Sequence, residues 1–319
     1  MNTRRFLLAA MLLIVFAYKF VPEISGGRQA LAFMNLDAKP KPDQVWRTDV
    51  VEVKSPASLE ARTPAGSVYV TSHDRSEIIV QTIVTLRGRP IAEGDKAPVS
   101  LSVDKKGNHV TVHAEVENRV GRSSPSISYR IYVPVETSVV SHTAGGSMTA
   151  KNLNGDVELK TSGGRIFVSK IKGDVDVSTS GGPITITGSS GHLKARTSGG
   201  VISLTDSDGS MDVRTSGGSL ELKNLSGSLE AITSGGAISA GIIHISDYLK
   251  LSTSGGAIHV ELPDNQGLDI RASGSSVHSD LKHFSGSHSR NSLTGTVLDG
   301  GIPVDIRTPG GSVRLRHGQ

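Results

Sequence analysis

Hydrophobic and polar residues alternate along most of the chain after about residue 49, and an alternation of period two predicts β-strands with one buried face. The alternating stretches are short and are separated by glycine, proline and small polar residues, which favour turns. The first group of these stretches comprises residues 51–53, 67–70, 78–86, 101–103, 109–116 and 127–135. We therefore expect a β-rich amino-terminal part over residues 49–142.

An internal repeat follows this part and is the strongest pattern in the sequence. Thr-Ser-Gly-Gly recurs with its threonine at positions 161, 179, 197, 215, 233 and 253, and Thr143 begins a related Thr-Ala-Gly-Gly. Counted from Thr143, five successive intervals are 18 residues and the sixth is 20. Apolar residues stand five and seven positions after each threonine, and in most repeats a glycine twelve positions after it opens a second alternation. Each repeat is therefore predicted to contain two short strands and two turns.

Strands with a single apolar face cannot bury that face alone, and so regular a repeat leaves no helix to cover it. The expected fold class is all-β: a parallel β-solenoid (β-helix) with 18-residue, two-strand coils, regular over residues 143–272. Successive coils would advance by about 4.8 Å, the spacing of neighbouring strands, and would stack each inward residue over its counterpart. Glycine would permit the close turns, and the recurring threonines would form a ladder of hydroxyl groups along one corner.

Two further copies of the motif stand apart from the regular array. Residues 59–70 contain Arg-Thr-Pro-Ala-Gly-Ser-Val, and residues 304–315 contain Arg-Thr-Pro-Gly-Gly-Ser-Val. We expect both copies to be terminal coils. The segments 71–142 and 273–299 would interrupt the solenoid and cap its exposed ends, so that residues 273–319 form a polar loop and a terminal coil.

The first 32 residues have the pattern of an export segment. Arg4 and Arg5 precede an unbroken apolar run over residues 6–17, which is typical of a secretory signal peptide. The run is short for a membrane span, but residues 6–21 would anchor the chain in the inner membrane if the segment is not cleaved. We expect a signal peptide or single-helix signal anchor over residues 1–32 and a linker over residues 33–48. Both alternatives predict an extracytoplasmic protein of the periplasm, cell envelope or cell surface.

Composition and charge exclude several classes of function. The 319 residues contain no cysteine, which excludes disulfides, thiol catalysis and cysteine-bound zinc. The formal net charge is +4, but residues 1–45 hold six Lys/Arg and three Asp/Glu, so the remaining chain carries only +1. A nucleic-acid partner is therefore not expected.

Residues from about 50 to 316 resemble a known bacterial family. The segment Tyr129-Arg-Ile-Tyr-Val-Pro134 leads into Thr143-Ala-Gly-Gly, and Gly-Asp-Val follows at residues 155–157 and 173–175. This combination is similar to the putative-adhesin family of β-strand-repeat proteins, a domain of unknown function that is similar in style to the head domain of putative autotransporter adhesins. The resemblance implies a β-helical, envelope-associated and non-enzymatic protein, and it supplies no catalytic residues.

No catalytic, cofactor-binding or metal-binding residue is expected. The turns lack the regular aspartates of a calcium β-roll, since Asp156 and Asp174 are not followed by acids at the next equivalent positions. His278, His283 and His288 lie in the polar segment, where a solvated loop is favoured over a zinc or nickel site. A polysaccharide-acting enzyme would need converging carboxylates, whereas the mixed charges on the second strands are better explained by pairing between neighbouring coils.

The outward side of the first strand in each repeat is the candidate contact face. It carries few formal charges, and we single out six positions on it: Phe167, Thr185, Val201, Ser203, Ala237 and Ser239. Such a face is either covered by segment 71–142 or 273–299, or it docks a protein, a glycan or a second copy of the chain. The sequence thus favours an exported binding or structural protein over two alternatives, a membrane-tethered sensor of envelope stress and a β-helix enzyme.

Overall fold

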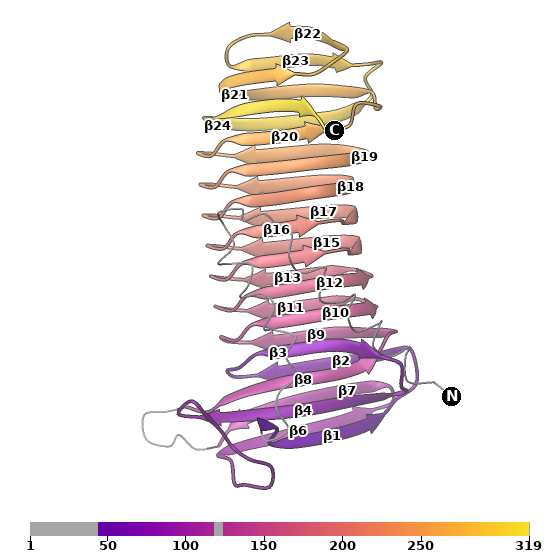
Figure 1. The fold of residues 1–319 in the computed structure, drawn as a ribbon, viewed down its shortest axis with the longest axis vertical. Helices are drawn as coiled ribbons and strands as arrows, with labels where there is room; N and C mark the ends of the chain where they lie inside the picture. Colours follow the sequence, from indigo (N-terminus) through magenta and orange to yellow (C-terminus); the bar gives the residue numbers. More distant parts are fainter. Residues whose placement is uncertain (1–43, 118–123, 319) are drawn as a thin grey trace, which may run out of the picture. The chain divides into compact units, whose positions relative to one another are not determined.

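A computed structural model describes residues 44–117 and 124–318. These residues form 24 β-strands joined by turns (Figure 1), and they contain no helix long and apolar enough to span a membrane. The all-β prediction is therefore confirmed. The expected signal peptide or anchor, residues 1–32, and most of the expected linker, residues 33–48, lie outside the described residues.

The repeats form a regular stack of parallel strands. Each strand pairs with the equivalent strand of the next repeat: Val157 pairs with Val175, and Ile166 pairs with Ile184. Residues that are 18 positions apart in the sequence are therefore paired with each other in the stack. The strands of the stack are β9 (Thr137–Thr143), β10 (Met148–Asn154), β11 (Val157–Thr161), β12 (Ile166–Lys172), β13 (Val175–Thr179), β14 (Ile184–Thr187), β15 (Ser190–Thr197), β16 (Ile202–Thr205), β17 (Asp208–Thr215), β18 (Leu220–Thr233) and β19 (Ile238–Thr253).

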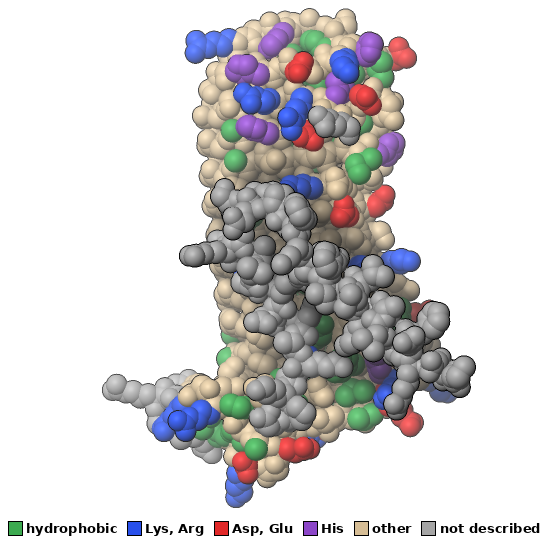
Figure 2. Space-filling model, in the orientation of Figure 1, with side chains coloured by type: hydrophobic (Ala, Val, Ile, Leu, Met, Phe, Trp, Pro, Cys, Tyr) green, Lys and Arg blue, Asp and Glu red, His purple; other side chains and the backbone are tan. Residues whose placement is uncertain are grey.

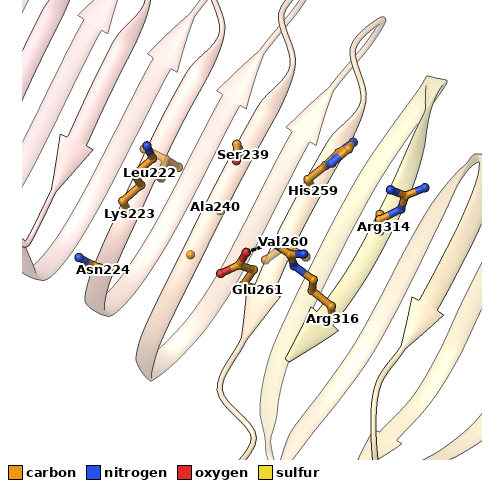
Figure 3. Close-up of a pocket in the computed structure, with 11 residues that line it drawn as sticks. Leu222, Lys223, Asn224, Ser239, Ala240, His259, Val260, Glu261, Arg314 and Arg316 are labelled. Atoms are coloured by element: carbon orange, nitrogen blue, oxygen red, sulfur yellow. Dashed lines mark hydrogen bonds and ion pairs between the residues drawn. The ribbon is translucent and has the colours of Figure 1, made fainter. Parts of the chain in front are cut away.

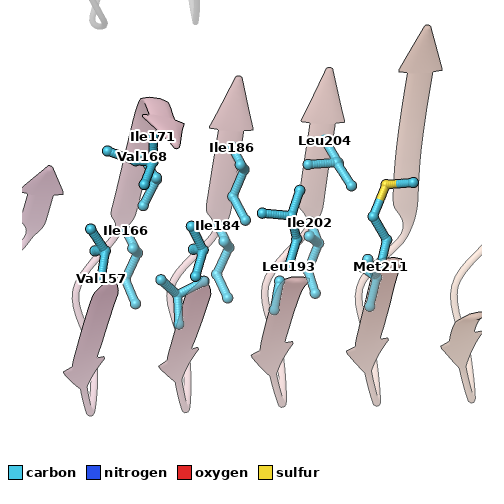
Figure 4. Close-up of a cluster of buried hydrophobic side chains, with 14 of the residues drawn as sticks. Val157, Ile166, Val168, Ile171, Ile184, Ile186, Leu193, Ile202, Leu204 and Met211 are labelled. Carbon is cyan, nitrogen blue, oxygen red and sulfur yellow. The ribbon is translucent and has the colours of Figure 1, made fainter. Parts of the chain in front are cut away.

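Columns of aliphatic side chains fill the interior of the stack (Figure 4). Every apolar position that the sequence predicts to point inward in the repeats is buried, as at Ile166 and Val175. A further buried column lies ten positions after each of the first five repeat threonines and consists of Leu153, Ile171, Ser189, Ser207 and Leu225. The sequence does not reveal this column, because it mixes large aliphatic side chains with serine.

The Thr-Ser-Gly-Gly corner explains why its residues recur. The hydroxyl of Thr179 donates a hydrogen bond to the carbonyl oxygen of Gly164 in the preceding repeat (3.0 Å) and accepts one from the N–H of Gly182 (3.3 Å). A Cβ atom at Gly182 would lie 2.0 Å from that same Gly164 oxygen, so no larger residue fits. The other repeats show the same arrangement, and the predicted ladder of hydroxyl groups is confirmed.

The amino-terminal end of the stack is not built in chain order. Its strands are β1 (Arg47–Glu52), β2 (Ala57–Thr63), β3 (Val68–His73), β4 (Glu77–Leu86), β5 (Arg89–Pro90), β6 (Val99–Lys106), β7 (His109–Val116) and β8 (Ser126–Pro134). β2 lies between β9 and β7, and β3 lies between β10 and β8, all in parallel. Residues 59–70 therefore continue the stack at this end, and they are followed in space by strands of segment 71–142. β7 and β8 lie beyond them and cover the edge that a terminal coil would leave unpaired.

The carboxy-terminal end is also built out of chain order. Its strands are β20 (Ile258–Leu262), β21 (Leu268–Asp280), β22 (Phe284–His288), β23 (Ser292–Val297) and β24 (Ile302–His317). β24 pairs in parallel with β19 and β20 on one side and with β21 on the other, and β23 pairs antiparallel with β21 and β22. Residues 304–315 are thus inserted between two layers and are not terminal.

The polar segment 273–299 differs from its expected loop structure. Most of these residues belong to β21, β22 and β23. Backbone N–H and C=O groups make the pairing, so strands rich in serine, glycine and histidine form without a clear alternation of apolar residues. The segment therefore closes this end of the stack as a set of strands.

Candidate functional site

Two outward surfaces run along the stack, which we call the first-strand face and the second-strand face. The first-strand face consists of the residues four, six and eight positions after each threonine; Val201, Ser203 and Thr205 form one such set. The same surface continues onto β3 at one end and onto β20 and β24 at the other. The second-strand face consists of the outward residues of β11, β13, β15, β17 and the second parts of β18 and β19.

The structure brings the six predicted contact residues onto the first-strand face. Phe167 pairs with Thr185, and Thr185 pairs with Ser203, so these three side chains form one continuous row across β12, β14 and β16. Ser239 on β19 continues the row after Glu221. Val201 and Ala237 precede β16 and β19 and lie in the adjacent row.

The described parts of segments 71–142 and 273–299 do not cover this face. Their strands pair edge to edge with the two ends of the stack, and Val201 keeps 40% of its surface exposed. Ala237 and Ser239 are exposed as well. The described residues of these two segments thus do not supply the cover that the first alternative requires, because end pairing satisfies their backbone groups without crossing the face.

Aromatic and basic side chains interleave at the amino-terminal end of the first-strand face. The Lys151 ammonium lies 5.1 Å from the ring centre of Phe167 and 5.7 Å from that of Tyr69. The Arg130 guanidinium lies 5.1 Å from the Tyr69 ring centre. These are cation–π distances. Sequence reasoning missed the arrangement, because Tyr69 and Arg130 reach Phe167 only through the out-of-order pairing of β3 and β8.

A hollow of about 340 Å³ lies near the carboxy-terminal end of the same face (Figure 3). The residues around it include Lys223, Asn224, Ser239, Gly241, His259 and Arg314. Arg316 also lines the hollow and forms an ion pair with Glu261. Basic, acidic and histidine side chains gather over the carboxy-terminal layers of the molecule, at the top of the view in Figure 2.

Ion pairs within strands and between neighbouring strands neutralise much of the second-strand face, and the pairs between strands are those that the sequence predicts. The Lys160 ammonium hydrogen-bonds to Glu158 and lowers the pKa of that carboxyl, while Glu158 raises the pKa of Lys160. The hydrogen bond to Asp212 likewise raises the pKa of Arg214. Further pairs join Lys194 to Asp176 (3.0 Å), Arg196 to Asp212 (2.7 Å) and Arg214 to Glu230 (3.0 Å).

Comparison with known proteins places the chain in a family. The Toastrack DUF4097 family model matches residues 65–316. The chain belongs to this family. The match confirms the family resemblance found in the sequence, and it covers the repeats together with β3–β8 at one end and β20–β23 and nearly all of β24 at the other.

Two solved structures share low similarity with this Toastrack chain. One is described as a putative cell adhesion protein from Clostridium sporogenes ATCC 15579, with 10% identity, a TM-score of 0.25 and coverage of 85% of this chain and 99% of the other. The second is a putative adhesin from Bacteroides fragilis NCTC 9343, with 16% identity, a TM-score of 0.40 and coverage of 84% and 96%. Both TM-scores are below 0.5, so neither structure is evidence for a function of this chain. No curated protein matches the chain.

The histidines considered as metal ligands lie at the carboxy-terminal end of the Toastrack chain. His278 belongs to β21 and His288 ends β22, and the ring nitrogen Nε2 of His288 lies 3.1 Å from the carbonyl oxygen of Val277. Residues 44–117 and 124–318 contain no group of three or more His, Cys, Asp or Glu side chains placed to hold a metal ion.

Proposed function

We propose that this chain is an exported, non-enzymatic parallel β-solenoid with 18-residue coils that acts as an adhesin-like binding protein of the bacterial cell envelope. Its first-strand face binds a protein or a glycan, or a second copy of the chain. Export is supported by Arg4 and Arg5 ahead of the apolar run 6–17. Cell fractionation with an intact-mass measurement tests export and distinguishes a cleaved chain from an anchored one.

The contrast between the two faces carries the proposal. On the second-strand face, charged residues form ion pairs with one another, so few unpaired charges remain to attract another molecule. The first-strand face carries no formal charge across two successive repeats, where its residues are Pro183, Thr185, Thr187, Val201, Ser203 and Thr205. A flat surface with exposed Val201 and many hydroxyl groups suits contact with another molecule.

The test is the double variant Val201→Lys with Ala237→Lys, which places two ammonium groups in the centre of the face. Both positions are exposed, so we expect the thermal unfolding temperature to change by only a few degrees. Binding to envelope fractions or to glycans, or self-association measured by sedimentation, should be lost because two long side chains would hold the partner away from the face.

A matched control adds the same charge elsewhere on the stack. Ser190 and Ser226 occupy the corner position that holds Lys172 in another repeat, so lysine is already tolerated there. The variant Ser190→Lys with Ser226→Lys should keep both stability and binding. Unchanged binding and association in the Val201 and Ala237 variant would contradict the proposal.

A further inference from the structure

The hollow on the first-strand face arises where one repeat has the smallest outward side chains. In that repeat the three outward residues are Ala237, Ser239 and Gly241. Longer side chains stand on both sides of it: Lys223 on the preceding repeat, and His259 and Arg314 on the next two layers (Figure 3). The hollow is therefore a missing row of side chains bounded by polar and basic walls.

The fold does not require glycine at position 241. Gly241 has no positive φ, and a Cβ atom there would lie 3.8 Å from its nearest neighbour, the Oε2 atom of Glu261. The equivalent positions in other repeats hold Thr187, Thr205 and Lys223. Glycine weakens a strand interior and commonly marks a place where a ligand approaches the backbone. Gly241 thus keeps open a space that a threonine would fill.

The charge around the hollow is mainly positive. Glu261 is already paired with Arg316, whereas Lys223 and Arg314 have no ion-pair partner among the described residues. Glu221 lies two residues before Lys223 on β18 but does not line the hollow. Lys223 and Arg314 stand on opposite walls of the hollow, three strands apart, and each suits a carboxylate or sulfate group.

We infer that the hollow binds an acidic oligosaccharide, with one of its oxyanions against Arg314 and another against Lys223. Ser239 and His259 supply hydrogen-bonding groups for sugar hydroxyls, and so does the Oδ1 atom of Asn224, whose Nδ2 already donates to Asp206. The rest of the saccharide lies along the uncharged, hydroxyl-bearing part of the first-strand face. The inference rests on the proposed function, since it names the ligand class of that face.

Isothermal titration calorimetry with defined oligosaccharides tests the inference. The probes are an oligogalacturonate, a sulfated dextran oligosaccharide and a neutral dextran oligosaccharide of similar length. The full chain should bind at least one acidic probe, more weakly as salt is raised, and should not bind the neutral probe. Gly241→Thr should weaken binding about tenfold or more while leaving the unfolding temperature at or above that of the wild type.

Charge removal supplies the second arm, with a control on the same strand. Arg314→Gln should also weaken binding about tenfold, the effect of one lost charge-assisted hydrogen bond. Arg307→Gln removes the same charge from β24. Arg307 pairs with Ser252 on the other face, so this variant should bind the acidic probe as tightly as the wild type does.

Three outcomes would overturn the inference. The first is that no acidic probe binds to the wild type, and the second is that Gly241→Thr binds as well as the wild type. The third is that inorganic sulfate displaces the oligosaccharide at equal concentration, which would make this a site for a lone oxyanion. None of them overturns the proposed function, because that proposal is tested separately, by the binding of the Val201→Lys, Ala237→Lys variant to envelope fractions.

Discussion

Single residues at the corners of the repeats show how closely the backbone limits the sequence. The residue nine positions after each of the first five repeat threonines has a left-handed backbone conformation, with φ of 57° at Asn152, 55° at Lys170, 62° at Gly188, 52° at Asp206 and 54° at Asn224. Asparagine, aspartate and glycine tolerate this conformation, whereas lysine does so at a cost. This corner cannot be predicted from the sequence, because the residue in the left-handed position differs from repeat to repeat.

Lys170 is therefore a position where substitution should stabilise the chain. Lys170→Asn is expected to raise the free energy of unfolding by up to about 1 kcal/mol, since asparagine adopts the left-handed region more readily. Lys172→Asn is the control, because Lys172 is also exposed and lies in the same repeat but has no positive φ. Thermal or urea unfolding measures both variants, and equal effects at the two positions would refute the backbone explanation.

At the scale of elements, the sequence predicts strands better than it predicts their neighbours. The alternation and the 18-residue interval are sufficient to pair Val157 with Val175, because identical spacing places identical residues side by side. The same information does not reveal that β2 and β24 are inserted between strands far away in the chain. Local alternation specifies which face of a strand is buried, but it does not specify which edge the strand pairs with.

The insertion of β24 leads to a prediction about the carboxy-terminal end. A chain that ends at Gly300 leaves β19 and β20 on one side and β21 on the other without their shared partner. Hydrogen exchange should lose protection at residues 249–262 and 268–280 and should keep it in β11–β17.

A peptide of residues 302–317 should restore that protection when it is added to the shortened chain. The same peptide with Val313→Asp should not, because Val313 is fully buried and a charge there would have no partner. Full protection at residues 249–262 without any peptide would show that β24 is not needed between these layers.

At the scale of the whole molecule, charge is divided between two surfaces. The paired charges of the second-strand face and the uncharged stretch of the first-strand face both follow from the repeat, since each outward row can be taken directly from the sequence. The hollow and the cluster of aromatic and basic side chains around Tyr69 cannot be predicted from the repeat. Arg314, Tyr69 and Arg130 reach the face only through inserted strands. Sequence reasoning therefore located the face but not the groups at its two ends.

The central claim is that contact occurs through the first-strand face, and site-specific labelling tests it most directly. The sequence contains no cysteine, so single variants Ser203→Cys and Ser178→Cys each provide one labelling site, on the first-strand and second-strand face respectively. Each is coupled to a bulky maleimide polymer and measured for binding to envelope fractions of the producing cells. The account predicts that the label at Ser203 abolishes binding and that the label at Ser178 does not. Equal binding by the two labelled proteins would contradict it.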